Sequence, residues 1–204
     1  FILLLFSYSI MFNSVFSFGT ETAAMFMVIG VYFLLNKQNH ILSGIFFGLA
    51  GITRLLVLVP ILTIFAIFLV SNKKNFLKLS SAFLIVFLLA NVIFVMLYGD
   101  NYITPVYKFH FLKSSGGEEN LKEYVDIIKL NWILFASALL FIFVKDKKQI
   151  NIFVMISIVY LVFLIALKKI FGFYFIIIFP FLAIIGGYGI VKVVKKSSPT
   201  KLGK

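Results

Sequence analysis

The sequence predicts an all-α protein, a polytopic bundle of transmembrane helices, on three observations. First, 62% of its 204 residues are hydrophobic and only 13% are charged, so a water-soluble fold would lack a polar surface. Second, residues 171–191 are an uncharged apolar run, which as a helix spans about 30 Å, the thickness of a bilayer's hydrocarbon core. Third, apolar runs recur between charged clusters along the chain. A soluble enzyme is therefore excluded.

Cutting the chain at its charged and polar clusters predicts about eight membrane segments. They are residues 1–18, 20–36, 41–53, 55–71, 79–98, 130–144, 150–167 and 171–191. The segment 41–53 would rise only about 20 Å as a helix, so we expect a thinned or re-entrant segment, or one arm of a tight hairpin with 55–71. Pro60, near the start of the second arm, is a candidate kink.

The distribution of basic residues predicts the orientation, because cytoplasmic loops of membrane proteins are enriched in Lys and Arg. Placing the end of the first segment outside puts twelve lysines on the cytoplasmic side: Lys37, Lys73, Lys74, Lys78, Lys145, Lys147, Lys148, Lys192, Lys195, Lys196, Lys201 and Lys204. Seven basic residues fall outside: Arg54, Lys108, Lys113, Lys122, Lys129, Lys168 and Lys169. Both termini are then cytoplasmic. The net charge of +12 reflects this topology and contact with anionic lipids, so nucleic acid is not an expected partner.

We therefore expect a transmembrane domain over residues 1–191 and a basic cytoplasmic tail over 192–204. The longest polar connection, the outer loop at about 99–129, contains an amphipathic stretch that predicts an interfacial helix, with Trp132 as an interfacial anchor. Because the chain begins at Phe1 inside an apolar run, we expect it to be the C-terminal part of a longer protein. It has no cysteine, so it forms no disulfide or thiolate site.

Two charged residues lie where apolar helices begin or end. Glu21, the only acid in the first 99 residues, follows Thr20 at the predicted outer start of a helix. It is either a helix-start carboxylate with Thr20 as N-cap or a ligand for a metal or substrate. Arg54 is the single arginine of the chain. It is either an interfacial arginine or a phosphate ligand, because its planar guanidinium matches phosphate geometry.

Further candidates lie in the outer loop and before the last segment. Tyr107, His110 and Lys113 belong to a stretch in which His110 is either merely exposed or an acid, base or phosphate donor. Lys168 and Lys169 precede Tyr174 and oppose the positive-inside rule. They either snorkel to lipid headgroups or bind something anionic outside.

The order of these motifs resembles the GT-C membrane glycosyltransferases, closest to the branch of protein O-mannosyltransferases and aminoarabinose transferases. The motifs are an outer acid, a G-x-x-x-G-L-A-x-x-T-R hairpin, an aromatic-His-aromatic-Leu-Lys loop and a late K-K-x-x-x-x-Y-x-x-x-x-x-P helix. The matching pieces are residues 17–35, 42–62, 104–113 and 168–185. Together they cover about half of the chain.

The resemblance implies transfer of a sugar from a polyprenyl-phosphate donor to an acceptor on the outer face of the cell membrane. Arg54 with Lys168 or Lys169 would hold the donor phosphate, and Glu21 would match a second acidic position that helps to bind a divalent metal or orient substrate in some members. The catalytic acid of the family would lie upstream of Phe1. The alternatives are a secondary transporter or lipid flippase, and a non-catalytic membrane scaffold.

Overall fold

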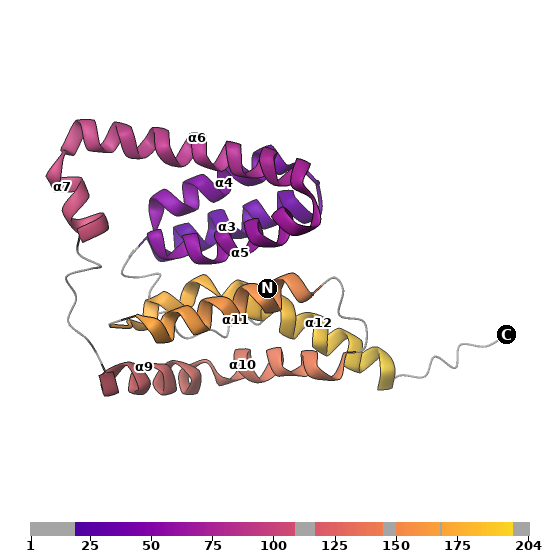
Figure 1. The fold of residues 1–204 in the computed structure, drawn as a ribbon. Coiled ribbons are helices and arrows are strands. Elements are labelled where there is room, and N and C mark those ends of the chain that lie inside the picture. Colours follow the sequence, from indigo (N-terminus) through magenta and orange to yellow (C-terminus); the bar gives the residue numbers. More distant parts are fainter. Residues whose placement is uncertain (1–18, 109–116, 145–149, 168, 198–204) are drawn as a thin grey trace.

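A computed structural model describes residues 19–108, 117–144, 150–167 and 169–197, and every element within them is helical (Figure 1). In chain order the elements are α3 (Thr20–Leu35), α4 (His40–Thr53), the 3-10 turn η1 (Leu55–Val57), α5 (Leu58–Ser71), α6 (Lys73–Tyr98), α7 (Asp100–Ile103), the π-helical turn η2 (Thr104–Lys108), α9 (Gly117–Leu130), α10 (Trp132–Leu139), the 3-10 turn η3 (Leu140–Phe143), α11 (Asn151–Ala166), the 3-10 segment η4 (Gly172–Ile177) and α12 (Phe179–Ser197). The all-α prediction is confirmed.

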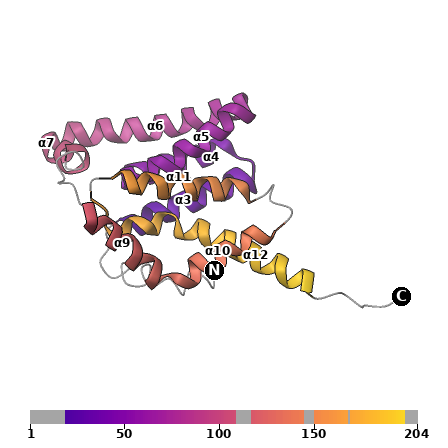
Figure 2. The same cartoon turned by 60° about the horizontal axis from the view of Figure 1, so that its bottom comes forward.

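The helices form two layers (Figure 1), which overlap in the view of Figure 2. In one layer α4 packs against both α3 and α6, and in the other α12 packs against both α10 and α11. Contacts of α5 with α11 and of α3 with η4 join the layers. Because successive helices alternate in direction, the connections fall at two ends. One end contains Gly19, Arg54, Gly99 and residues 169–173, and the other contains residues 36–39, Asn72 and Ile150. They are called the outer and the inner end after the orientation predicted from the sequence, which remains a prediction.

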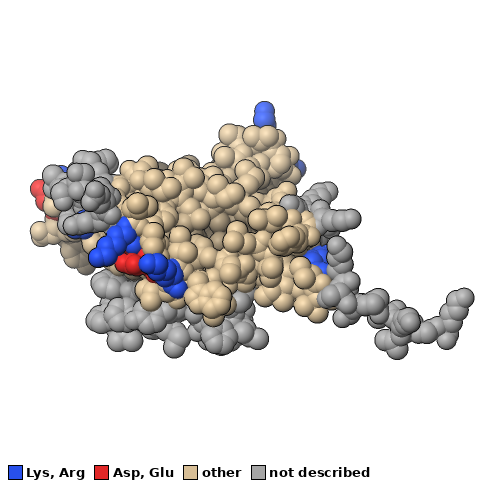
Figure 3. All heavy atoms as spheres, turned by 90° about the horizontal axis from the view of Figure 1, so that it is seen from below, with Lys and Arg blue, Asp and Glu red and all other residues tan. Residues whose placement is uncertain are grey.

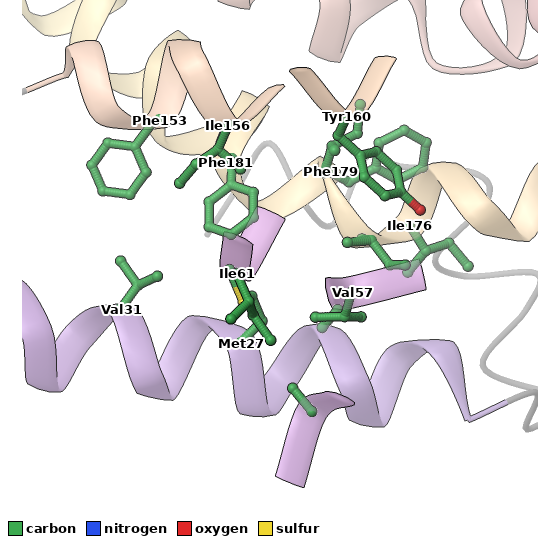
Figure 4. Close-up of a cluster of buried hydrophobic side chains, with 14 of the residues drawn as sticks. Met27, Val31, Val57, Ile61, Phe153, Ile156, Tyr160, Ile176, Phe179 and Phe181 are labelled. Carbon is green, nitrogen blue, oxygen red and sulfur yellow. The ribbon is translucent and has the colours of Figure 1, made fainter. Parts of the chain in front are cut away.

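The core lies where α3 faces α11 and α12 (Figure 4). Met27 of α3, Ile61 of α5 and Ile156 of α11 have no solvent exposure, and neither do Phe179 and Phe181 of α12. Burying such a side chain stabilises a fold in water by about 1.5–3 kcal/mol. In lipid the corresponding gain comes from close packing between helices.

Local sequence explains where several helices start. The side chains of Asn39 and Asn72 accept hydrogen bonds from the backbone N–H groups of Leu42 at 3.0 Å and Asn75 at 3.1 Å, which makes both asparagines N-caps. The expected cap at Thr20 is wrong. Gly19 is the N-cap, with a φ of 72° that favours glycine, and no side-chain cap hydrogen bond is present there.

Helix length limits how much of the multi-pass prediction the structure supports. Among the described residues, α6 is the one helix that is long and apolar enough to cross a bilayer by itself, and the pair α9 and α10–η3 qualifies together but is bent by 80°. The other apolar helices have 10–17 residues when α12 is counted from Phe179 to Val194, and they rise about 15–26 Å, less than the roughly 30 Å hydrocarbon core. Eight full crossings are therefore not supported by length and composition.

Other boundaries differ in detail from the prediction. The chain reverses at Arg54 between segments 41–53 and 55–71, but the two do not form a closely packed hairpin, because α4 packs on α3 and α6 whereas α5 packs on α11 and α6. Pro60 lies in the first turn of α5, where its missing N–H interrupts no helical hydrogen bond. The run 171–191 is broken into η4 and α12, and α12 extends beyond 191 to Ser197. The interfacial helix of the outer loop corresponds to α9, and Trp132, which follows it, is 63% exposed.

Candidate functional site

Arg54 is positioned by the tight reversal between α4 and η1. Its backbone is extended, with φ −155° and ψ 115°, its N–H donates to the carbonyl of Ala50 at 3.0 Å, and its own carbonyl accepts from Val57 at 3.1 Å. Both backbone groups are therefore satisfied at the break between two helices. The side chain is half-buried, and its contacts with other segments determine where it points.

The guanidinium of Arg54 lies over aromatic rings that come from the far end of the chain. Its Cζ is 5.0 Å from the ring centre of Phe173 and 6.0 Å from that of Tyr174, within the range of cation–π attraction. Its Nε is buried and has no hydrogen-bond acceptor among the described residues. A buried N–H of a cation without an acceptor is costly, so an anion would be stabilised here.

Phe171, Phe173 and Tyr174 form a continuous aromatic row, and a second cation lies on it. Phe171 and Phe173 are stacked with centres 5.5 Å apart, and Phe173 meets Tyr174 edge-on at 4.8 Å. The ammonium of Lys169 is 5.8 Å from the centre of Phe171. The predicted cations Arg54 and Lys169 are thus brought to one aromatic row, although 114 positions separate them in the sequence.

Tyr174 fixes this row to the core. Its side chain is 1% exposed, and its carbonyl accepts a hydrogen bond from the hydroxyl of the fully buried Tyr160 at 3.0 Å. The rings under Arg54 are therefore held by α11. Sequence reasoning selected Tyr174 but missed Phe171 and Phe173 as partners of the cations, although the aromatic run Phe-Gly-Phe-Tyr-Phe is visible there.

Glu21 lies at the same end of the bundle, in the first turn of α3. The start of α3 touches the end of α4, since a Cβ on Gly19 would lie 3.7 Å from the methyl carbon of Thr53. The same helix packs against η4. One carboxylate oxygen of Glu21, Oε1, is buried without a hydrogen-bond partner among the described residues. An acidic residue in the first turn of a helix is a common arrangement, because it lies at the positive end of the helix dipole.

The outer-loop candidates have different outcomes. The hydroxyls of Tyr107 and Tyr102 both donate to Oδ1 of Asn91, which ties η2 and α7 to α6. His110, Lys113 and Lys168 lie outside the described residues. Their proposed roles remain predictions.

A metal site is not formed by the described residues alone. Within them, no three His, Asp or Glu side chains come together. Glu21 supplies one carboxylate, so a divalent ion bound there would need ligands from other parts of the protein. The metal role of Glu21 also remains a prediction.

Two hollows lie away from Arg54. One, of about 310 Å³, lies towards the inner end between α3, α11 and α12 and includes Tyr32 and Asn36. The other is an apolar groove of about 810 Å³ between α5 and α11, with Leu62 and Met155 among its lining residues. Cations and acids instead gather at the outer end over α9, and the face between the two ends is almost uncharged (Figure 3).

Comparison of the chain with known protein families, with characterised proteins and with solved structures finds no match.

Proposed function

We propose that this chain is part of an integral, multi-pass membrane glycosyltransferase that moves a sugar from a polyprenyl-phosphate donor to an acceptor on the outer face. The observation that carries the proposal is the environment of Arg54. Its half-buried guanidinium has an Nε without a hydrogen-bond acceptor among the described residues, and it lies on an aromatic row with a second cation, Lys169, at the predicted outer end. The transferred sugar and the lipid carrier in this proposal are those that the resemblance to the GT-C glycosyltransferases implies.

The chemistry assigned to these residues is stabilisation of the leaving group. The acceptor oxygen attacks the anomeric carbon, the bond from that carbon to the phosphate oxygen breaks, and the lipid phosphate leaves with one additional negative charge. The acceptor's proton passes to a carboxylate that acts as general base, as the resemblance implies. Arg54 and Lys169 would bind the phosphate most tightly as its charge increases, which lowers the barrier.

The multi-pass arrangement is supported by where the connections fall. The inner end carries Lys37, Lys73 and Lys74, whereas the basic residues of the outer end are accompanied by acids such as Asp100, which is 3.6 Å from Lys108. Helices shorter than the bilayer are accommodated where the bilayer thins or where flanking residues snorkel.

The test is transfer of a radiolabelled sugar from a polyprenyl-phosphate donor by the purified full-length protein. Arg54→Ala should lower turnover about 100-fold or more, on the scale of removing one transition-state donor. Arg54→Lys keeps the charge without the planar fork and should retain weak activity. Glu21→Gln should fall between these variants if its carboxylate orients metal or acceptor.

Lys108→Ala is the matched control, because it removes an exposed cation from the same end. It should leave turnover near that of the wild type. Wild-type turnover for Arg54→Ala would overturn the phosphate role and favour a transporter or a scaffold.

A further inference from the structure

The segment that carries Lys169 begins with an irregular stretch of backbone between α11 and η4. Leu167 has an extended conformation, with φ −72° and ψ 142°, and so does Phe171, with φ −126° and ψ 143°. The carbonyls at the end of a helix have no partner within that helix. The conformation of this connection therefore depends on contacts from elsewhere in the fold.

One side chain from α9 supplies such contacts on both sides of the lysine pair. Nδ2 of Asn120 donates to the carbonyl of Leu167 at 3.0 Å, and Oδ1 of the same amide accepts from the N–H of Ile170 at 2.8 Å. Both bonds have good lengths. The Asn120 amide thus holds the backbone on either side of residues 168 and 169.

The rest of α9 packs directly on the same segment. The hydroxyl of Tyr124 donates to the carbonyl of Leu161, and its ring meets Phe175 edge-on at 4.9 Å. Gly172 allows this close approach, because a Cβ there would lie 2.8 Å from Cδ1 of Ile127 and 2.9 Å from Oε1 of Glu123. Helix α9 therefore packs against η4 in addition to linking η2 to α10.

We infer that Asn120 is a positioning residue, which holds the 167–170 connection so that Lys169 keeps its place on the aromatic row that also contacts Arg54. This inference rests on the proposed phosphate site. Asn120 itself need not touch the ligand. Its effect is to order the segment in advance, so that binding a phosphate does not have to fix a mobile lysine and its backbone.

The first measurement is hydrogen exchange at the backbone N–H of Ile170, by mass spectrometry of the full-length protein in detergent. Asn120→Ala removes the acceptor, so this amide should exchange about tenfold faster or more. Asn120→Asp keeps an acceptor oxygen and should preserve protection. Exchange in α4 should stay unchanged in both variants, which would show that the bundle is intact. Unchanged exchange at Ile170 in Asn120→Ala would overturn the inference.

The second measurement is the affinity for farnesyl phosphate, determined by calorimetry. Asn120→Ala should weaken binding about tenfold, the effect expected for losing two hydrogen bonds that order the site. Asn101→Ala, an exposed amide of α7 at the same end, is the matched control and should bind as the wild type does.

The two proposals fail in different ways. Wild-type affinity in Asn120→Ala, together with fast exchange at Ile170 and weakened binding in Arg54→Ala, would overturn the positioning role alone. Wild-type affinity in Arg54→Ala would overturn the proposed phosphate site, and the positioning role with it.

Discussion

Asn91 connects α7 and η2 to α6, the longest described helix, through the oxygen of its side-chain amide. Its Oδ1 accepts from the hydroxyl of Tyr102 at 2.7 Å and also from that of Tyr107, while its Nδ2 donates to the carbonyl of Phe87 at 2.7 Å. Both tyrosines donate, so this arrangement requires neutral phenols. Burial, followed by the neighbouring Tyr107, raises the pKa of Tyr102 to about 12.

Stability should consequently fall at high pH. The pKa of an unfolded tyrosine is about 10, so the stabilisation from Tyr102 is complete below that pH and is lost as the pH rises towards the folded pKa of about 12. In an ultraviolet titration of phenolate absorbance, subtracting the curve of Tyr102→Phe from that of the wild type should isolate a step near pH 12. A step near pH 10 would contradict the donating role of this partly buried hydroxyl.

At the scale of single residues, the charged candidates can be chosen from the sequence, but the side chains that contact them cannot. Arg54 is conspicuous in the sequence as the single arginine, and Lys169 because it opposes the positive-inside rule. Their shared aromatic row comes from packing between distant segments. The expected cap at Thr20 was wrong because the preceding glycine adopts a positive φ. Asn120 could not be predicted, since an asparagine near the start of an amphipathic helix is also typical of an ordinary polar face.

Glycines determine how closely α4 approaches α6. A Cβ on Gly44 would lie 2.4 Å from the carbonyl oxygen of Leu79 and 2.8 Å from the Cβ of Ala82, and a Cβ on Gly48 would lie 2.8 Å from Val86. The backbone carbonyl of a helix cannot move aside cheaply. These two glycines therefore set the distance between the helices, as small residues do in membrane bundles.

Gly44→Ala should accordingly destabilise the protein by about 1–3 kcal/mol, because overpacking exceeds the gain in helix propensity. Gly187→Ala in α12 is the matched control, since no described atom lies within 4 Å of its added Cβ, and it should be neutral or stabilising by up to about 1 kcal/mol. Thermal unfolding in detergent measures both. Equal stability of the two variants would show that α4 and α6 are not in close contact.

At the scale of elements, apolar runs predicted where helices lie but not how long they are. The segments 20–36, 41–53 and 55–71 correspond closely to α3, α4 and η1–α5, because polar residues end each run. The run 171–191 contains no charge, yet it is divided near Ile178. Gly172 is needed for contact with α9, and Pro180 fits only the first turn of the helix that follows. A hydropathy pattern reports neither the close approach at Gly172 nor the restriction on Pro180.

The whole molecule separates its charges along the direction of its helices, and this separation predicts orientation. Positive residues without acids favour the cytoplasmic side, so the inner end, with Lys37, Lys73 and Lys74, should face the cytoplasm. The end that contains Arg54 should face outwards, where a polyprenyl-phosphate donor would be used. The proposed site is chemically reasonable only if this orientation holds.

The absence of cysteine from the sequence makes the orientation directly measurable. Single cysteines at Asn101, Asn75 and Asn151 flank α6 and the α9–α10 pair, and should react with a membrane-impermeant maleimide according to their side of the membrane. Asn101→Cys should be labelled in intact cells, and Asn75→Cys and Asn151→Cys only after permeabilisation, because α6 and the bent pair each cross once in the proposed topology. Labelling of all three from one side would remove the crossings, since short helices would then lie within one leaflet. A reversed pattern would place Arg54 in the cytoplasm and overturn transfer on the outer face, while leaving the helical packing unchanged.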